Sequence, residues 1–274
     1  MKVGVVVESF RLGLKGGVEK SAELGLDGIQ VYGCGGELDA QTITDSARDE
    51  IQRFIESRGL EISALVGEVG GFNHADKNEE RVEITKSVIS LARKMGVSVV
   101  SGHWGFIPNA AAHPMWKTVM ECVSAIAEHA AKEEIYFAAE TGMEKAVALR
   151  RFIEAVHSHW VRVNYDPANL VMASGDDPVE GVRTLGDLIV HTHAKDGVKL
   201  GDWTPAEAFL GDRKDDPAEL MREMPLGQGG VDFPAWIGAL RDVGYDGFLT
   251  IEREAGDDPV KDIAEAAEYL RELV

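Results

Sequence analysis

The chain has 274 residues, of which 45% are hydrophobic and 27% are charged, a balance typical of a soluble globular protein with a large core. Its 28 basic and 47 acidic residues give a formal net charge of −19. A field of this sign repels phosphate backbones and anionic lipids, so no nucleic acid and no membrane is expected as a partner. The net charge does not exclude small phosphorylated ligands, because a binding site can be locally basic.

The cysteine content and the N-terminus favour a reducing compartment. Cys34 and Cys122 are too few for a disulfide framework. The first apolar run ends at Glu8 and is too short for a signal peptide or a membrane span. We therefore expect a cytoplasmic protein.

The first half of the chain alternates strand patterns with helix patterns. Short aliphatic runs between glycines indicate strands, and apolar residues spaced three and four apart indicate helices. The predicted strands cover residues 2–8, 28–32, 60–66 and 97–101. The predicted helices cover residues 16–25, 45–59, 80–95 and 114–132.

The second half repeats this alternation and adds one long insertion. The predicted strands cover residues 135–140, 161–166, 188–195 and 247–252, and the predicted helices 144–156, 178–185, 233–243 and 260–273. Residues 197–230 form the insertion, rich in Gly, Asp and Pro, in which 206–210 resemble a short helix. Long loops in compact domains are usually functional, so we expect this one to overhang a binding site.

Eight strand–helix units without a linker predict a parallel sheet closed into a (β/α)8 TIM barrel, an α/β fold with one domain over residues 1–274. An open, doubly wound sheet is the alternative. It would usually carry a glycine fingerprint after the first strand, and residues 13–17 match neither G-x-G-x-x-G nor a P-loop.

The last four predicted strands each end in a metal-ligand side chain: Glu140, Asp166, His193 and Glu252. The carboxyl ends of barrel strands meet at one mouth, so these side chains are expected to lie together. Three carboxylates there would repel one another, and a divalent cation would resolve the repulsion. Three carboxylates with one imidazole suit Mn²⁺ best, with Co²⁺, Mg²⁺ and Zn²⁺ as alternatives.

The sequence resembles the sugar phosphate isomerase/epimerase superfamily, whose members have a xylose isomerase-like TIM barrel. Ketose 3-epimerases, hydroxypyruvate isomerases and inosose dehydratases belong to it. The resemblance implies a Mn²⁺-type site made by the four strand-end residues, and proton transfer by Glu140 and Glu252 on opposite faces of the substrate. It is carried by residues 139–141, 164–170, 191–196, 225–233 and 244–252.

The expected activity is that of an isomerase or epimerase acting on a small sugar or keto-polyol. Such an enzyme removes a proton next to a carbonyl and passes through a metal-bound enediolate. The sequence departs from ketose 3-epimerases, which carry Glu and His where this chain has Ala146 and Asn169, and an arginine after the metal histidine where only Lys195 and Lys199 are near. These departures weaken the 3-epimerase assignment specifically.

Other functions compete with this one. A metal-dependent lyase or dehydratase acting on a keto-inositol or 3-keto-glycoside would use the same metal. A phosphodiesterase of the AP endonuclease type would need clustered metals and a basic DNA face, which the net charge of −19 disfavours. A non-catalytic sugar-binding barrel would not need the four metal ligands.

Further side chains are expected around the substrate. Glu8, His103 and Trp104 lie at predicted strand ends, Asn169 follows Asp166, and Lys195 follows His193. We predict that these five bind the substrate. His191 shares a strand face with His193 one layer deeper and is expected to pack rather than to ligate. The oligomeric state stays open, with a homo-oligomer as one option.

Overall fold

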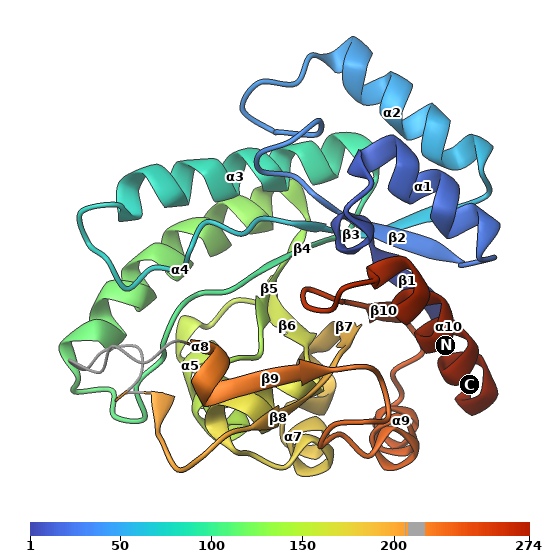
Figure 1. Cartoon of the computed structure of the whole chain (residues 1–274). Coiled ribbons are helices and arrows are strands. Elements are labelled where there is room, and N and C mark those ends of the chain that lie inside the picture. The colour runs from blue at the N-terminus through green and yellow to red at the C-terminus, as the bar shows by residue number, and fades with distance from the viewer. Residues whose placement is uncertain (206, 208–216) are drawn as a thin grey trace.

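The computed structural model describes residues 1–205, 207 and 217–274. Eight parallel strands close into a barrel in the order β1-β10-β7-β6-β5-β4-β3-β2 (Figure 1). The predicted (β/α)8 barrel is therefore confirmed. The strands are β1 (Lys2–Val6), β2 (Gly28–Tyr32), β3 (Glu61–Val66), β4 (Val99–Gly102), β5 (Tyr136–Glu140), β6 (Val161–Tyr165), β7 (Ile189–Ala194) and β10 (Phe248–Ile251).

A helix follows each barrel strand and covers the outside of the barrel (Figure 1). Short helical segments also lie in the connections: η1 (Val7–Phe10), α6 (Pro167–Asn169), η2 (Leu170–Ser174) and α8 (Pro217–Leu220) follow strands, and η3 (Gly186–Leu188) joins α7 to β7. The main helices are α1 (Gly13–Glu23), α2 (Asp45–Ser57), α3 (Asn78–Met95), α4 (Pro114–Glu133), α5 (Ala146–Val156), α7 (Pro178–Leu185), α9 (Phe233–Asp242) and α10 (Pro259–Leu273).

The last three main helices begin with the same local device. Asp177, Asp232 and Asp258 each accept a backbone N–H of the first helical turn, and a proline stands at the first or second helical position. The carboxylate accepts a backbone N–H that has no partner within the helix. Proline suits this position because it has no backbone N–H that would need a partner. These caps fix where the chain leaves the strand ends and enters the helices.

The insertion begins and ends in a two-stranded antiparallel sheet of β8 (Asp196–Lys199) and β9 (Met221–Met224), which the sequence analysis did not anticipate. This β8–β9 hairpin packs against α6 and η2. A side chain at Gly197 would collide with Met172, so glycine permits the close approach. The predicted helix over residues 206–210 lies outside the described residues, apart from Glu207. No helix in the described part of the chain is long and apolar enough to cross a membrane.

Candidate metal centre

Four consecutive strands around the barrel bring the predicted ligands together. Glu140 ends β5, Asp166 follows β6, His193 lies in β7 and Glu252 follows β10. Each offers one ligand atom, and these four atoms lie within 4.8 Å of one another. His193 Nδ1 is 3.3 Å from Glu140 Oε1, 3.7 Å from Asp166 Oδ2 and 3.3 Å from Glu252 Oε2.

Two atoms of this cluster test whether a metal ion fits. Among the described residues, Asp166 Oδ2 and His193 Nδ1 are buried and have no hydrogen-bond partner, although buried polar atoms are normally paired. Octahedral bonds of about 2.1 Å would place neighbouring ligand atoms about 3 Å apart and opposite ones about 4.2 Å apart. The observed separations are close to these values. The residues therefore fit a divalent cation.

The ring of His193 is held by side chains from other strands. Its Nε2 lies 2.9 Å from Gln30 Oε1, an oxygen that can only accept, so this contact requires a proton on Nε2 and leaves Nδ1 as the ring nitrogen available to a metal ion. Gln30 in turn donates to Ser101 Oγ at 2.7 Å. This hydrogen bond turns the free nitrogen toward the three carboxylates, as in histidines that bind metals.

His191 belongs to the supporting layer and not to the cluster. Its Nδ1 lies 2.9 Å from Asn164 Oδ1, and its Nε2 lies 3.1 Å from both Ser63 Oγ and Thr250 Oγ1. The Asn164 amide also lies 3.1 Å from His193 Nε2. These partners come from separate strands, so their hydrogen bonds join β3, β6, β7 and β10 next to the cluster of Glu140, Asp166, His193 and Glu252.

The charges of the cluster depend strongly on one another. Burial disfavours a charged His193, but the carboxylates of Glu252 and Glu140 outweigh burial and raise its pKa. Burial likewise raises the pKa of Asp166. Burial would also raise the pKa of Glu252, but His193 and Lys195 lower it. The cluster thus favours a positive charge at its centre, which a divalent cation would supply.

His103 follows β4 and faces Glu140. Its Nε2 lies 3.5 Å from Glu140 Oε1, and its Nδ1 lies 3.0 Å from Glu68 Oε2. Glu68 also accepts the backbone N–H of His103 at 2.9 Å. Glu68 was not among the predicted site residues, although it follows β3 as the predicted ligands follow their strands. Glu68 could have been predicted from the sequence by looking for an acidic residue just after each predicted strand.

The remaining predicted substrate contacts lie at different depths. Asn169 Nδ2 donates to Glu140 Oε1 at 3.2 Å, so it touches the cluster directly. Glu8 Oε1 accepts the backbone N–H of Tyr32 at 3.1 Å and lines a cavity of about 220 Å³ that Glu252 also lines. Trp104 is buried, and its ring stacks on Phe137 with 4.8 Å between centroids.

Lys195 lies between β7 and β8 with its ammonium among carboxylates. Its Nζ donates to Glu252 Oε2 at 2.9 Å and also to Glu254, and it lies 3.7 Å from Glu223 Oε2. Although burial opposes it, these carboxylates and Asp166 raise the pKa of Lys195, so the ammonium stays charged. Glu223, on β9, was not anticipated from the sequence, because its position depends on the hairpin.

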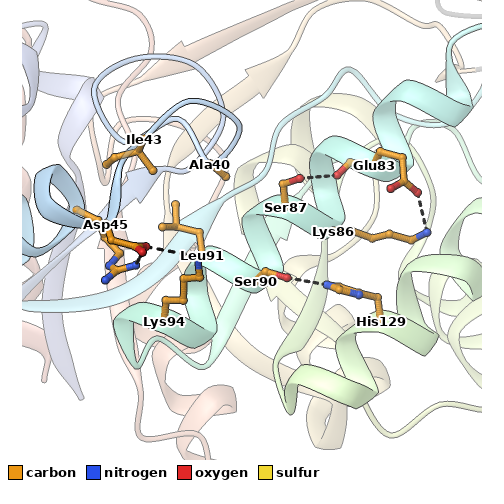
Figure 2. Close-up of a pocket in the computed structure, with 11 residues that line it drawn as sticks. Ala40, Ile43, Asp45, Glu83, Lys86, Ser87, Ser90, Leu91, Lys94 and His129 are labelled. Atoms are coloured by element: carbon orange, nitrogen blue, oxygen red, sulfur yellow. Dashed lines mark hydrogen bonds and ion pairs between the residues drawn. The ribbon is translucent and has the colours of Figure 1, made fainter.

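A separate groove of about 480 Å³ lies in the helical layer, between α2, α3 and α4 (Figure 2). Its charges are paired with one another: Asp45 with Arg48 and Lys94, and Glu83 with Lys86. Ser90 Oγ lies 2.9 Å from His129 Nε2, and Figure 2 marks this hydrogen bond. The groove is formed by helices rather than by strand ends, so it is not part of the metal cluster.

Comparison with known proteins supports this architecture. The family model described as xylose isomerase-like TIM barrel matches residues 18–273, so the chain belongs to that family. Solved structures with a similar fold include a D-psicose 3-epimerase, a 3-keto-D-glucoside 4-epimerase and a probable 3-DHS dehydratase. A search of curated proteins finds no match to this sequence.

Three solved structures illustrate the likeness. A xylose isomerase domain protein from Planctomyces limnophilus is 24% identical with a TM-score of 0.82, covering 99% of this chain and 96% of that one. A 3-keto-D-glucoside 4-epimerase from E. coli is 17% identical, and a probable 3-DHS dehydratase from Bacillus anthracis is 19% identical. Both have a TM-score of 0.74 and cover 99% of each chain. At these identities the likeness establishes the fold.

Proposed function

We propose that this protein is a divalent-metal-dependent isomerase or epimerase that moves a proton next to the carbonyl of a small sugar or keto-polyol. The observation that carries the proposal is a pair of buried atoms, Asp166 Oδ2 and His193 Nδ1, which have no hydrogen-bond partner in the described part of the chain and face Glu140 and Glu252. Such atoms are costly to bury unless an ion binds them. One solved structure with a similar fold is a 3-keto-D-glucoside 4-epimerase, which agrees with the proposal.

The residues divide into holding and proton-moving roles. Glu140, Asp166, His193 and Glu252 would hold the ion, with Mn²⁺ as the expected metal. When bound, the ion supplies positive charge to the substrate oxygens that become negative as a proton leaves. Glu140 and Glu252 project from strands β5 and β10, with β6 and β7 between them in the barrel. A substrate lying between them would meet one carboxylate on each side, one to remove the proton and one to return it.

Two other side chains are proposed to position the substrate. His103 lies next to Glu140, and its Nδ1 is anchored by Glu68, so its Nε2 points toward the cluster. Glu8 lines the cavity beside Glu252. Both would offer hydrogen bonds to hydroxyl groups of a sugar.

A lyase or dehydratase acting through the same site is the second candidate. Its support is the departure from ketose 3-epimerases at two positions. Ala146 is a buried residue of α5 without a proton-transfer group, and the Asn169 amide binds Glu140. The likeness to a probable 3-DHS dehydratase agrees with this alternative.

Incubation of the Mn²⁺-loaded protein with a panel of keto-sugars and keto-polyols in D₂O separates the candidates. Deuterium in an isomerised product supports the first function, and an unsaturated product supports the second. Glu140→Gln and Glu252→Gln should each lower kcat about 10²–10⁴-fold, whereas Glu121→Gln, an exposed change on α4, should not. Exchange at the wild-type rate in both metal-loaded site variants would exclude the two-glutamate mechanism.

A further inference from the structure

The β8–β9 hairpin is joined to the strand end that carries Glu252 by a buried set of charges. We propose that Lys195 and Glu223 are positioning residues that hold Glu252 in place as a metal ligand, so that metal binding and docking of the hairpin stabilise each other. The inference rests on the proposed metal site but not on which reaction the site catalyses.

Lys195 is the first part of the connection. Its side chain is only 4% exposed, and its Nζ lies 2.9 Å from Glu252 Oε2. The same oxygen lies 3.3 Å from His193 Nδ1. One ammonium therefore fixes the oxygen that faces the metal position. Lys195 directly precedes Asp196, the first residue of β8, so movement of the hairpin would move this ammonium.

Asp196 anchors the base of the hairpin. Its carboxylate accepts the backbone N–H groups of Gly197, Gly229 and Val231 at 2.8, 2.8 and 3.1 Å. It thereby joins the start of β8 to the segment that leads into α9. The backbone around Lys195 is thus fixed on both sides, by β7 before it and by this carboxylate after it.

Glu223 is the second part, and it reaches the same strand end from β9. Its side chain is 7% exposed and accepts the backbone N–H groups of Glu254 and Ala255 at 3.2 Å. Arg253 Nη1 donates to the same carboxylate at 2.5 Å. The carboxylate of β9 therefore caps the loop that begins directly after Glu252.

Arg253 extends the connection into α10. Its Nε donates to Asp262 Oδ2 at 2.8 Å, and its backbone N–H donates to Ser9 Oγ at 3.1 Å. The loop after β10 is thus held by β9 on one side and by α10 and η1 on the other. Loss of Glu223 would remove the support on the hairpin side alone.

Thermodynamic linkage gives the expected consequence. If the hairpin holds Glu252 for the metal, the metal must hold the hairpin by the same factor. Couplings of this kind typically change affinity by about 5- to 150-fold. We expect Glu223→Gln to weaken Mn²⁺ binding within this range. Mn²⁺ should in turn slow amide hydrogen exchange in β8 and β9.

Arg222→Gln provides a matched control, because Arg222 is an exposed neighbour on the same strand. Titration calorimetry would measure Mn²⁺ affinity in wild type, Glu223→Gln, Arg222→Gln, Lys195→Met and Lys195→Arg. Electron paramagnetic resonance would report the geometry around bound Mn²⁺, and hydrogen exchange would report the hairpin. Thermal unfolding of each variant would establish that it is folded.

The inference predicts weaker binding and an altered spectrum in Glu223→Gln and Lys195→Met, wild-type behaviour in Arg222→Gln, and partial recovery in Lys195→Arg. A purely structural role would lower the melting temperature of Glu223→Gln while leaving Mn²⁺ affinity and the spectrum unchanged, and would overturn the inference. The inference would also be overturned if wild type binds Mn²⁺ but the rate of amide hydrogen exchange in β8 and β9 stays the same with and without it. A wild type that binds no divalent ion would overturn the metal site as well.

Discussion

Replacing Asp166 by Asn should stabilise the metal-free protein while abolishing its response to metal. Asp166 is fully buried; its Oδ1 accepts the backbone N–H of Asn169 at 3.0 Å, and its Oδ2 has no partner among the described residues. Asparagine keeps the shape and the oxygen that accepts the Asn169 N–H, and it removes the negative charge. Removing an unsatisfied buried charge of this kind should gain about 1–3 kcal/mol.

The corresponding shift in melting temperature follows from chain length. An unfolding entropy of about 2.1 cal/mol/K per residue gives about 0.6 kcal/mol/K for the 274-residue chain, so the gain equals about 2–5 °C. Wild type should gain about 2.7 kcal/mol from Mn²⁺ at a hundred times its Kd, or about 5 °C. The Asn variant should gain almost nothing, because it lacks one anionic ligand.

Calorimetric melting of chelator-stripped protein, with and without Mn²⁺, tests both halves of this expectation. Asp177→Asn is the matched control. Asp177 is an exposed helix cap whose Oδ1 accepts the N–H groups of Val179 and Glu180, and asparagine caps equally well. That variant should behave as wild type in both conditions. A stripped Asp166→Asn protein that melts below wild type, or that gains as much from Mn²⁺, would refute the reasoning.

Two further changes probe residues around the site. Burial raises the pKa of Glu144 from its usual 4.5 to about 7, so its contribution to stability is complete below pH 4.5 and is lost as the pH rises through 7. The stability of wild type relative to Glu144→Gln should therefore fall by up to about 3 kcal/mol over that range in urea unfolding; a constant difference would contradict the assignment. Gly105 has φ of 87°, and a side chain there would collide with Asn73. Gly105→Ala should cost about 1–3 kcal/mol in the same assay, and an unchanged midpoint would show that this turn relaxes freely.

The sequence predicts the barrel and the cluster because both depend on short-range patterns. Buried strands read as aliphatic runs, and a polar residue that ends such a run lies at the carboxyl end of its strand. Glu140, Asp166, His193 and Glu252 were found this way, and the closed strand order then places β5, β6, β7 and β10 side by side. No knowledge of side-chain contacts was needed to expect these four together.

The supporting residues were harder to predict, because their roles depend on the folded insertion. β8 and β9 have four residues each and mix charged with apolar side chains, so neither gives a strong strand signal. Glu223 acquires its role only when β9 pairs with β8 and reaches the loop after β10. The partners of Lys195 likewise come from β9 and from the β10 end, which are distant in sequence. From the sequence, strand alternation placed Lys195 on the same face as His193, and this indicated only that the lysine could contact the substrate.

The arrangement also explains why the cluster needs so much support. Three carboxylates buried close together would be unfavourable in isolation, because their charges repel and lose hydration, and within the described residues Asp166 Oδ2 has no hydrogen-bond partner. The barrel holds them together because each stands at the end of a hydrogen-bonded strand and is restrained by fixed neighbours. Asn169 restrains Glu140, Gln30 restrains His193 and Lys195 restrains Glu252. The restraints come from different loops and strands, so the four side chains keep their positions without an ion, and an ion that bound there would not need to order them.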